Sequence, residues 1–219
     1  VHTVREPQSA SNLEYLGVKQ KNIIVSYDSA FFVKGSSRKD LVKKEGISKG
    51  DIAIAIRGDR SLKELKYLIN SLSKFSQETG HQIYFIYTCY AHDKKLFNEL
   101  SKHISLRSPA EYYNYDDVIE LLRGFDLLIT DRYHAAIFSM IAGTPVIAID
   151  SITKKLGSLM EAIKYPLKTI QSDEIENNLY PQIKRVVNER DELSDFVSAR
   201  VHEARKNVSY SIMSLKDFM

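Results

Sequence analysis

The sequence is poor in several features that would place it in a specialised class of protein. The 219 residues include a single cysteine, Cys89, which excludes an internal disulfide and favours a reducing compartment, so we expect a cytoplasmic protein. The apolar run YFIYTCY around Cys89 predicts a buried, inert thiol. No apolar run approaches the roughly 18 residues of a membrane helix, so no integral membrane segment is expected.

The chain also lacks a strong excess of charge. Its 31 basic and 28 acidic residues leave a formal net charge of +3, and no run of five basic residues occurs. With this charge balance we do not expect a nucleic-acid partner. The weak positive charge suits a small anionic ligand. With 43% hydrophobic residues, the chain has the composition of a folded globular protein.

Apolar strands alternate with helical patterns from residue 51 onward. The strand candidates are DIAIAIRG, QIYFIYTCY, DLLITD and TPVIAID, and amphipathic stretches such as SLKELKYLINSLSKFSQETG lie between them. The strands are apolar throughout, without the alternation of a half-exposed sheet. We therefore predict an α/β fold, a Rossmann-like parallel sheet with helices on both faces.

The pattern also predicts how the chain is divided. Residues 35–50 are polar and rich in glycine and lysine, which is typical of a linker. Residues 51–171 are expected to form the Rossmann-like domain, and residues 172–219 C-terminal helices. Before the linker, residues 9–16 predict a short helix with Ser9 or Ser11 as its N-cap and Gly17 as its stop.

The stretch LLITDRYHAAIFSM, residues 127–140, carries the candidate site. Its strand should end at the carboxyl rim of the sheet, where parallel α/β folds bind ligands, and a helix N-terminus there attracts anions. Arg132 adds a bidentate fork for phosphate or carboxylate, and His134 a proton donor or acceptor. The alternatives are that Arg132 pairs with a neighbouring acid and that His134 only packs. Asp131 is expected to be the helix N-cap.

This stretch resembles the signature of the polysaccharide pyruvyl transferases, in which a strand ends in Arg-Leu-His and a Gly-x-Pro turn follows the next helix. Here the segment is Arg132-Tyr133-His134, with tyrosine in place of the usual leucine, followed by Gly143-Thr144-Pro145. VREPQSASNLEYLGV resembles the family's R-[DE]-x-x-S segment, and YDSAFF its Asp-Pro-Ala-Phe element with Ser29 at the proline position. The similarity runs from about residue 4 to residue 165.

The resemblance implies one half of a GT-B-type fold, with residues 1–34 as the remnant of an N-terminal Rossmann-like domain that contributes acceptor contacts. It also implies transfer of the enolpyruvyl group of phosphoenolpyruvate, as donor substrate and without a further cofactor, to a sugar or lipid-linked sugar. The product would be a pyruvate ketal on a cell-surface or exopolysaccharide precursor. Arg5, Arg132 and Tyr133 would bind substrate, and His134 would be catalytic.

Further candidates follow from position alone. Arg57 ends a strand at the same rim, although a surface arginine that starts a loop is an equal alternative. Lys154 or Lys155 follows the last strand, where the resemblance also places a lysine. The tyrosines of YYNY, residues 112–115, stack on a sugar or pack beneath a loop. No metal site is expected, because no ligand cluster accompanies Asp131 and His134.

Two other functions remain open. A GT-B glycosyltransferase that uses a nucleotide-sugar would need an acidic residue for the ribose, and Glu161 is the candidate. A noncatalytic sugar-binding domain would tolerate substitution of Arg132 and His134 without loss of function.

Overall fold

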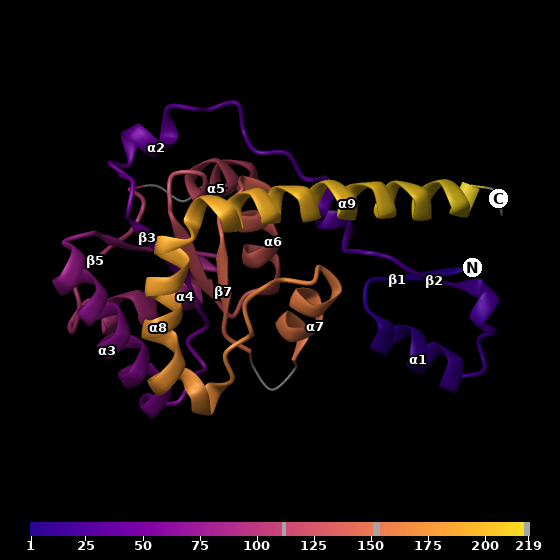
Figure 1. Ribbon diagram of the computed structural model, residues 1–219, viewed down its shortest axis with the longest axis horizontal. Coiled ribbons are helices and arrows are strands. Elements are labelled where there is room, and N and C mark those ends of the chain that lie inside the picture. Colours follow the sequence, from indigo (N-terminus) through magenta and orange to yellow (C-terminus); the bar gives the residue numbers. More distant parts are fainter. Residues whose placement is uncertain (111–112, 151–153, 217–219) are drawn as a thin grey trace.

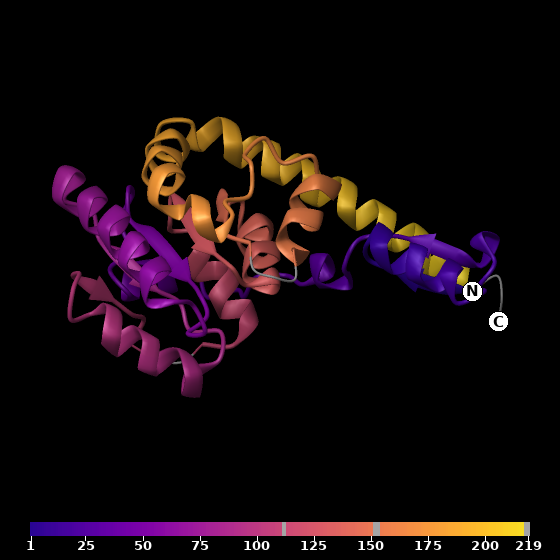
Figure 2. The ribbon, with the colours of Figure 1, turned by 90° about the horizontal axis from the view of Figure 1, so that it is seen from below.

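A computed structural model, which describes residues 1–110, 113–150 and 154–216, has a five-stranded parallel sheet at its centre (Figures 1 and 2). The strands pair in the order β5-β4-β3-β6-β7. Their bounds are β3 Ile52–Ala55, β4 Ile83–Phe85, β5 Leu106–Arg107, β6 Leu127–Thr130 and β7 Val146–Ala148. The parallel sheet predicted from the apolar strands is confirmed.

The central strands are apolar on both faces because both faces are covered. Every residue of β3 and β6 is buried, and Ala55 pairs with Thr130 at the carboxyl end of their ladder. Thr130 is the polar exception among these strand residues. Its hydroxyl donates to the Ala55 carbonyl at 2.6 Å, which satisfies the buried group.

Helices cover the two faces of the sheet, as predicted. One core joins the strands to α3, α4 and α8, and the second core joins them to α5, α6, α7 and α9. The bounds are α3 Leu62–Thr79, α4 Tyr90–Leu100, α5 Tyr115–Leu122, α6 Tyr133–Ala142, α7 Lys155–Ala162, α8 Ile175–Asn188 and α9 Arg190–Lys216. We call residues 51–188 with their sheet the sheet domain. None of the described helices is long and apolar enough to cross a membrane.

Residues 2–25 form a separate small layer, which we call the N-terminal unit. Strand β1 (His2–Val4) pairs in parallel with β2 (Ile23–Val25) across α1 (Pro7–Tyr15), and neither strand joins the large sheet. A short 3-10 turn, Gln20–Asn22, precedes β2. Figures 1 and 2 show the unit projecting from the sheet domain beside the far end of α9.

The predicted start of α1 is wrong by two residues. The N-cap is Glu6 and Pro7 is the first helical residue, a position that suits proline because the helix needs no N–H there. Ser11 lies inside the helix, and its hydroxyl donates to the Pro7 carbonyl at 3.3 Å. Gly17 ends the segment with φ +90°, as predicted.

The segment expected to be a linker lies against the sheet domain. It forms the single-turn helix α2 (Leu41–Lys44), whose Leu41 is fully buried, and Ile47 is 7% exposed. The Tyr84 hydroxyl from β4 donates to the Gly46 carbonyl at 3.1 Å. Residues 35–50 therefore pack on the core, while the division of the chain into domains stays a prediction.

Helix α9 connects the sheet domain with the N-terminal unit. Ser194, near its start, donates to the Gly143 carbonyl at 2.6 Å. Further along, the Arg205 guanidinium donates to the carbonyls of Phe31 (2.7 Å) and Val33 (3.1 Å), at the end of the 3-10 turn Ser29–Phe32 that follows β2. The helix thereby holds the segment that leads out of the N-terminal unit.

Candidate functional site

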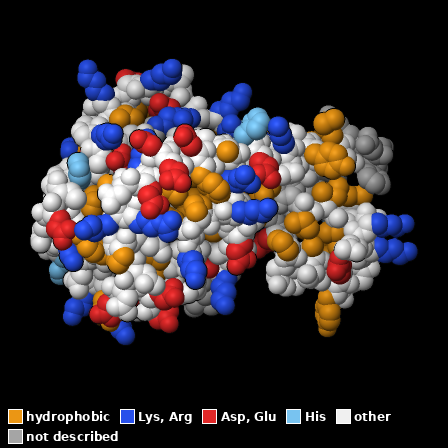
Figure 3. All heavy atoms as spheres, in the orientation of Figure 1, with side chains coloured by type: hydrophobic (Ala, Val, Ile, Leu, Met, Phe, Trp, Pro, Cys, Tyr) orange, Lys and Arg blue, Asp and Glu red, His pale blue; other side chains and the backbone are white. Residues whose placement is uncertain are grey.

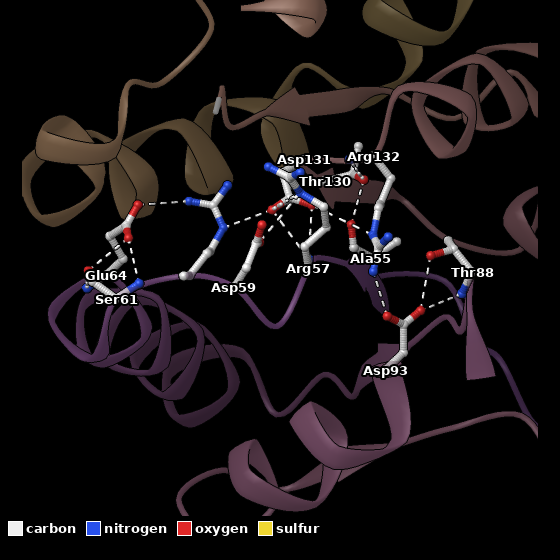
Figure 4. Close-up of polar contacts among 11 residues, drawn as sticks. Ala55, Arg57, Asp59, Ser61, Glu64, Thr88, Asp93, Thr130, Asp131 and Arg132 are labelled. Carbon is white, nitrogen blue, oxygen red and sulfur yellow. Dashed lines mark hydrogen bonds and ion pairs between the residues drawn. The ribbon is translucent and has the colours of Figure 1, made fainter. Parts of the chain in front are cut away.

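The strand order creates a crevice between β3 and β6. From β3 the chain winds outward through β4 to β5, and it then returns to β6 and winds the other way to β7. The loops after β3 and β6 therefore leave in opposite directions at neighbouring carboxyl ends, where open α/β sheets bind ligands. Arg57 follows β3, and Asp131 and Arg132 follow β6. Figure 4 shows these residues together.

Asp131 ties the two loops together. Its side chain is fully buried and accepts from the Arg57 backbone N–H at 3.0 Å and from Arg60 Nε at 2.9 Å (Figure 4). Burial raises the pKa of this carboxyl group, against the opposing effect of Arg60, Arg57 and Arg132. The expectation that Asp131 caps α6 is wrong, because Arg132 is the N-cap residue. The Arg132 N–H instead donates to the Thr130 hydroxyl at 2.9 Å.

Arg132 reaches across the crevice to the first turn of α4. Its Nη2 donates to Asp93 Oδ1 at 2.5 Å, and Asp93 is itself 1% exposed (Figure 4). The other Asp93 oxygen accepts from the Thr88 and Cys89 backbone N–H groups, both at 2.8 Å. The Arg132 Nε is buried and has no hydrogen-bond partner among the described residues. Arg132 is therefore oriented by an acid, the alternative raised from sequence, while its side chain stays 23% exposed.

A second cluster forms where the N-terminal unit meets α6. Arg5 Nη1 donates to Asp28 Oδ2 at 2.6 Å, and its guanidinium carbon lies 4.6 Å from the centre of the Tyr133 ring. His134 Nε2 lies 3.8 Å from the same Asp28 oxygen. One carboxylate oxygen thus faces an arginine and a histidine that are far apart in the sequence. Ala30 N–H donates to the other oxygen at 2.9 Å and orients the carboxylate.

The environment differs sharply along the Tyr133–His134 pair. Burial raises the pKa of the Tyr133 hydroxyl to about 12, with a further contribution from Asp28, so Tyr133 is neutral at physiological pH. The His134 side chain is 59% exposed. Tyr133 is therefore a contact residue between the two layers, and His134 is accessible to a ligand.

The other sequence candidates lie in different surroundings. Arg57 joins the crevice, with its Nε 3.8 Å from Asp131 and 3.6 Å from Asp59. Lys154 lies in a separate hollow of about 640 Å³, which it shares with Glu161 and which contains none of the arginines above. The structure therefore brings Arg57 together with Arg132, and Arg5 together with Tyr133 and His134, whereas Lys154 lies in another hollow.

Two hollows meet at Arg132. One, of about 410 Å³, is walled mainly by aromatic side chains and includes His134; the other, of about 500 Å³, includes Arg57, His92 and Lys95. Cys89 lines the second hollow and is exposed, so the buried thiol predicted from its apolar run is wrong. The strand ends at Phe85, and Cys89 caps α4 instead of continuing the strand.

Three charged residues that pair with the candidate site residues were not predicted from the sequence. Asp28 was part of the quoted YDSAFF element but was given no role, and Asp93 and Arg60 had no local signal. Asp28 pairs with Arg5, Asp93 with Arg132, and Arg60 with Asp131, in each case from a distant segment of the chain. Of the YYNY tyrosines, Tyr112 lies outside the described residues.

The fold is shared with GT-B-type enzymes that handle nucleotide-sugars. The chain aligns over 85% of its length with UDP-GlcNAc 2-epimerase from Methanocaldococcus jannaschii, solved with UDP-GlcNAc and UDP (TM-score 0.62, 14% identity, 54% of that chain). It aligns over 97% with S. aureus MnaA, solved with UDP (TM-score 0.63, 13% identity, 59% of that chain). It aligns over 99% with Anabaena HepE, solved with UDP-glucose (TM-score 0.62, 14% identity, 63% of that chain).

These similarities define the class of fold: a parallel sheet with helices on both faces, of GT-B type. The chain spans less than two thirds of the length of each of these structures. A search of curated protein sequences returned no match. Residues 1–152 match the family model of the polysaccharide pyruvyl transferases, and the chain belongs to that family.

Proposed function

We propose that the chain carries the donor site of an enzyme that transfers the enolpyruvyl group of phosphoenolpyruvate to a sugar of a polysaccharide precursor, in the cytoplasm. The proposal rests on one observation: two segments that resemble the family, one containing Arg5 and the other Arg132 to His134, contact each other. Arg5 of the first segment and Tyr133 and His134 of the second gather around Asp28, with Arg132 beside them. Transferase function follows from the family, and the ketal chemistry is our proposal.

The donor carries two anionic ends, a phosphate and a carboxylate. Arg132 precedes the Tyr133–His134 pair and Arg5 lies over the Tyr133 ring, so two permanently charged forks flank the pair in sequence or space. Each guanidinium group has five N–H donors, and its hydrogen bond to Asp93 or Asp28 does not use all of them. We assign Arg132 to one anionic end of the donor and Arg5 to the other.

His134 is proposed as the acid. It gives a proton to the methylene carbon of the donor, and a sugar hydroxyl adds to the resulting cationic carbon and returns its proton to His134. The bond to the phosphate oxygen then breaks, and a second hydroxyl closes the ketal while its proton leaves on the phosphate. Of the two hydroxyl protons, one ends in the new methyl group and the other on phosphate. Asp28, 3.8 Å from Nε2, orients the imidazole.

Calorimetry with phosphoenolpyruvate tests the donor site. We expect the chain to bind phosphoenolpyruvate, and Arg132→Lys to weaken binding at least about tenfold because lysine cannot form the planar fork. Arg185→Ala is the control, since Arg185 is a half-exposed arginine on α8 that pairs with Glu189 at the end of that helix. Unchanged affinity in Arg132→Lys would remove that arginine from the donor site.

Turnover tests the proposed acid. In the transfer reaction, His134→Ala should lose most of kcat, whereas His202→Ala, an exposed histidine on α9, should keep it. Near-normal turnover by a folded His134→Ala protein would exclude histidine as the acid.

The nucleotide-sugar alternative rests on the solved relatives that bind UDP or UDP-sugars. Its candidate acid for the ribose, Glu161, lies in the hollow away from Arg132, and the described residues of α6 include no acid. Titration with UDP-glucose in the same calorimetric experiment separates the two functions. Preference for UDP-glucose over phosphoenolpyruvate would favour the glycosyltransferase.

A further inference from the structure

A row of aromatic rings runs along α6 away from Arg5. The ring centres of Tyr133 and His134 are 5.6 Å apart, those of His134 and Phe138 are 6.3 Å apart, and those of Phe138 and Tyr115 are 6.3 Å apart. His134 and Phe138 are near parallel, at 25°, because residues four apart lie on the same face of a helix. Tyr115 joins the row from the first turn of α5.

The row forms one wall of the hollow of about 410 Å³ beside Arg132. This volume is within the roughly 300–1,000 Å³ range of small-molecule sites. Tyr87 and Tyr113 add further rings, and Thr88 and Arg132 add hydrogen-bonding groups. Tyr115 is 57% exposed, so its end of the row is open to solvent, whereas Phe138 also packs against the core.

The chemistry of the lining distinguishes between the two substrates of the proposed reaction. Arg132 is the one arginine or lysine in the described lining, and no aspartate or glutamate is present there. The donor, whose anionic ends are assigned to Arg132 and Arg5, would find only Arg132 here beside six aromatic or imidazole rings, because Arg5 is not in the described lining. A neutral pyranose fits better, because its C–H face packs on an aromatic ring while its hydroxyls reach the hydrogen-bonding groups at the edge.

We propose that this hollow is the acceptor subsite, in which a sugar ring stacks on Phe138 and Tyr115. The inference rests on the proposed pyruvyl transfer and adds the location of its acceptor. His134 then lies between the substrates, with Phe138 on the acceptor side and Asp28 and Arg5 on the donor side. A hydroxyl of the stacked sugar is thereby placed beside the imidazole that exchanges protons with the donor.

Saturation-transfer NMR tests the subsite without knowledge of the natural acceptor. The probes are methyl β-galactopyranoside and methyl β-glucopyranoside, which differ at one hydroxyl, with uridine as comparator. We expect saturation to reach the ring C–H protons of at least one glycoside. The signal should fall about fivefold in Phe138→Leu and Tyr115→Leu and recover in Phe138→Tyr, because stacking needs the ring.

Tyr180→Leu is the matched control, since Tyr180 is a tyrosine on α8 that lines neither hollow at Arg132. Should Phe138→Leu unfold, the exposed Tyr115 provides the same test without a change in the core. Phosphoenolpyruvate calorimetry on these samples should be unchanged. Glycoside signals that persist in both leucine variants, or are absent from the wild-type chain, overturn the acceptor subsite.

The same samples separate failure of the subsite from failure of the proposed function. Phosphoenolpyruvate binding without glycoside contact leaves the pyruvyl transfer standing and rejects the subsite. Glycoside contact without phosphoenolpyruvate binding rejects the transfer. Uridine that binds more tightly than the glycosides, and loses its signal in Phe138→Leu, rejects both and assigns the rings to a nucleoside.

Discussion

The sheet domain and the N-terminal unit are built from the same β-α-β pattern but differ in how they are stabilised. All residues of β3 and β6 are buried, whereas β1 and β2 have none buried and α1 has none either. Tyr15 is 92% exposed and Leu16 75%, and Figure 3 shows hydrophobic side chains on the surface of this unit. The comparison shows that a parallel pair needs layers on both faces before its apolar residues stabilise it.

The difference also explains where the polar networks lie. In the sheet domain, the buried Asp131 organises loops that hydrophobic packing has already brought together. At the N-terminal unit, by contrast, Arg5 of the unit, Asp28 just beyond it and Tyr133 of α6 are themselves part of the attachment to the sheet domain. Substitutions in the two regions should therefore differ in both size and kind.

The largest effect is expected at Asp131. Asp131→Ala leaves the 5%-exposed Arg60 side chain without its buried carboxylate, and losing one partner of a buried pair costs about 3–5 kcal/mol. Urea unfolding measures the change. Asp59→Ala is the control, because Asp59 is 68% exposed although it also lies near Arg57; a similar loss in both variants would contradict the special role of burial.

The comparison between strands is tested by one pair of truncations. Ile129→Ala, at a fully buried position of β6, should lower the free energy of unfolding by about 2–5 kcal/mol. Val25→Ala, at a 49%-exposed position of β2, should cost below about 0.5 kcal/mol. Equal losses of unfolding free energy in the two variants would mean that β2 is packed as tightly as β6.

A smaller and more local effect is expected from Tyr133→Ala. Loss of the ring under Arg5 removes about 1 kcal/mol, so amide exchange of residues 2–25 should quicken about fivefold while the sheet domain keeps its protection. Tyr180→Ala serves as the control, since its ring contacts Lys74 at 4.3 Å within the sheet domain. Exchange that rises equally throughout the chain would show that Tyr133 supports the whole fold instead.

The effect that is absent at neutral pH appears only in alkaline solution. The pKa of Tyr133 is raised from 10 to about 12, so the folded protein keeps a proton that the unfolded chain loses between those values. Stability contributed below pH 10 is therefore lost as the pH rises from 10 to 12. Tyr133→Phe should show a shallower loss of unfolding free energy in this window. An identical slope in both proteins would place the ring in a more solvated setting.

Much of the fold was predictable because the strands are short, apolar and bounded by clear signals. Gly80 ends α3 in a left-handed conformation at φ 73°, and Ser61 with Glu64 forms the capping box at its start. Local patterns of this kind need no knowledge of distant residues. The rim position of Arg132 and His134 followed from the same local reasoning together with the rule for parallel sheets.

The remaining site features depended on contacts between distant segments. Nothing near Asp131 indicates that it binds the loop after β3 instead of capping α6, and nothing near Asp28 indicates that it faces His134. Cys89 was misjudged because an apolar run continued past the end of its strand. Side-chain pairing across elements is set by topology, and local propensity carries little information about it.

Helix α9 is long and links the sheet domain with the N-terminal unit. Its 27 residues correspond to a length of about 40 Å at 1.5 Å per residue. Arg205, which holds the segment after Asp28, lies 11 residues beyond Ser194, or about 16 Å along the helix. A turn of about 5° at Ser194 would displace Arg205 by about 1.4 Å. Such a shift is a large part of the 3.8 Å between His134 and Asp28, so packing at the base of α9 bears on the distance between this histidine and its carboxylate.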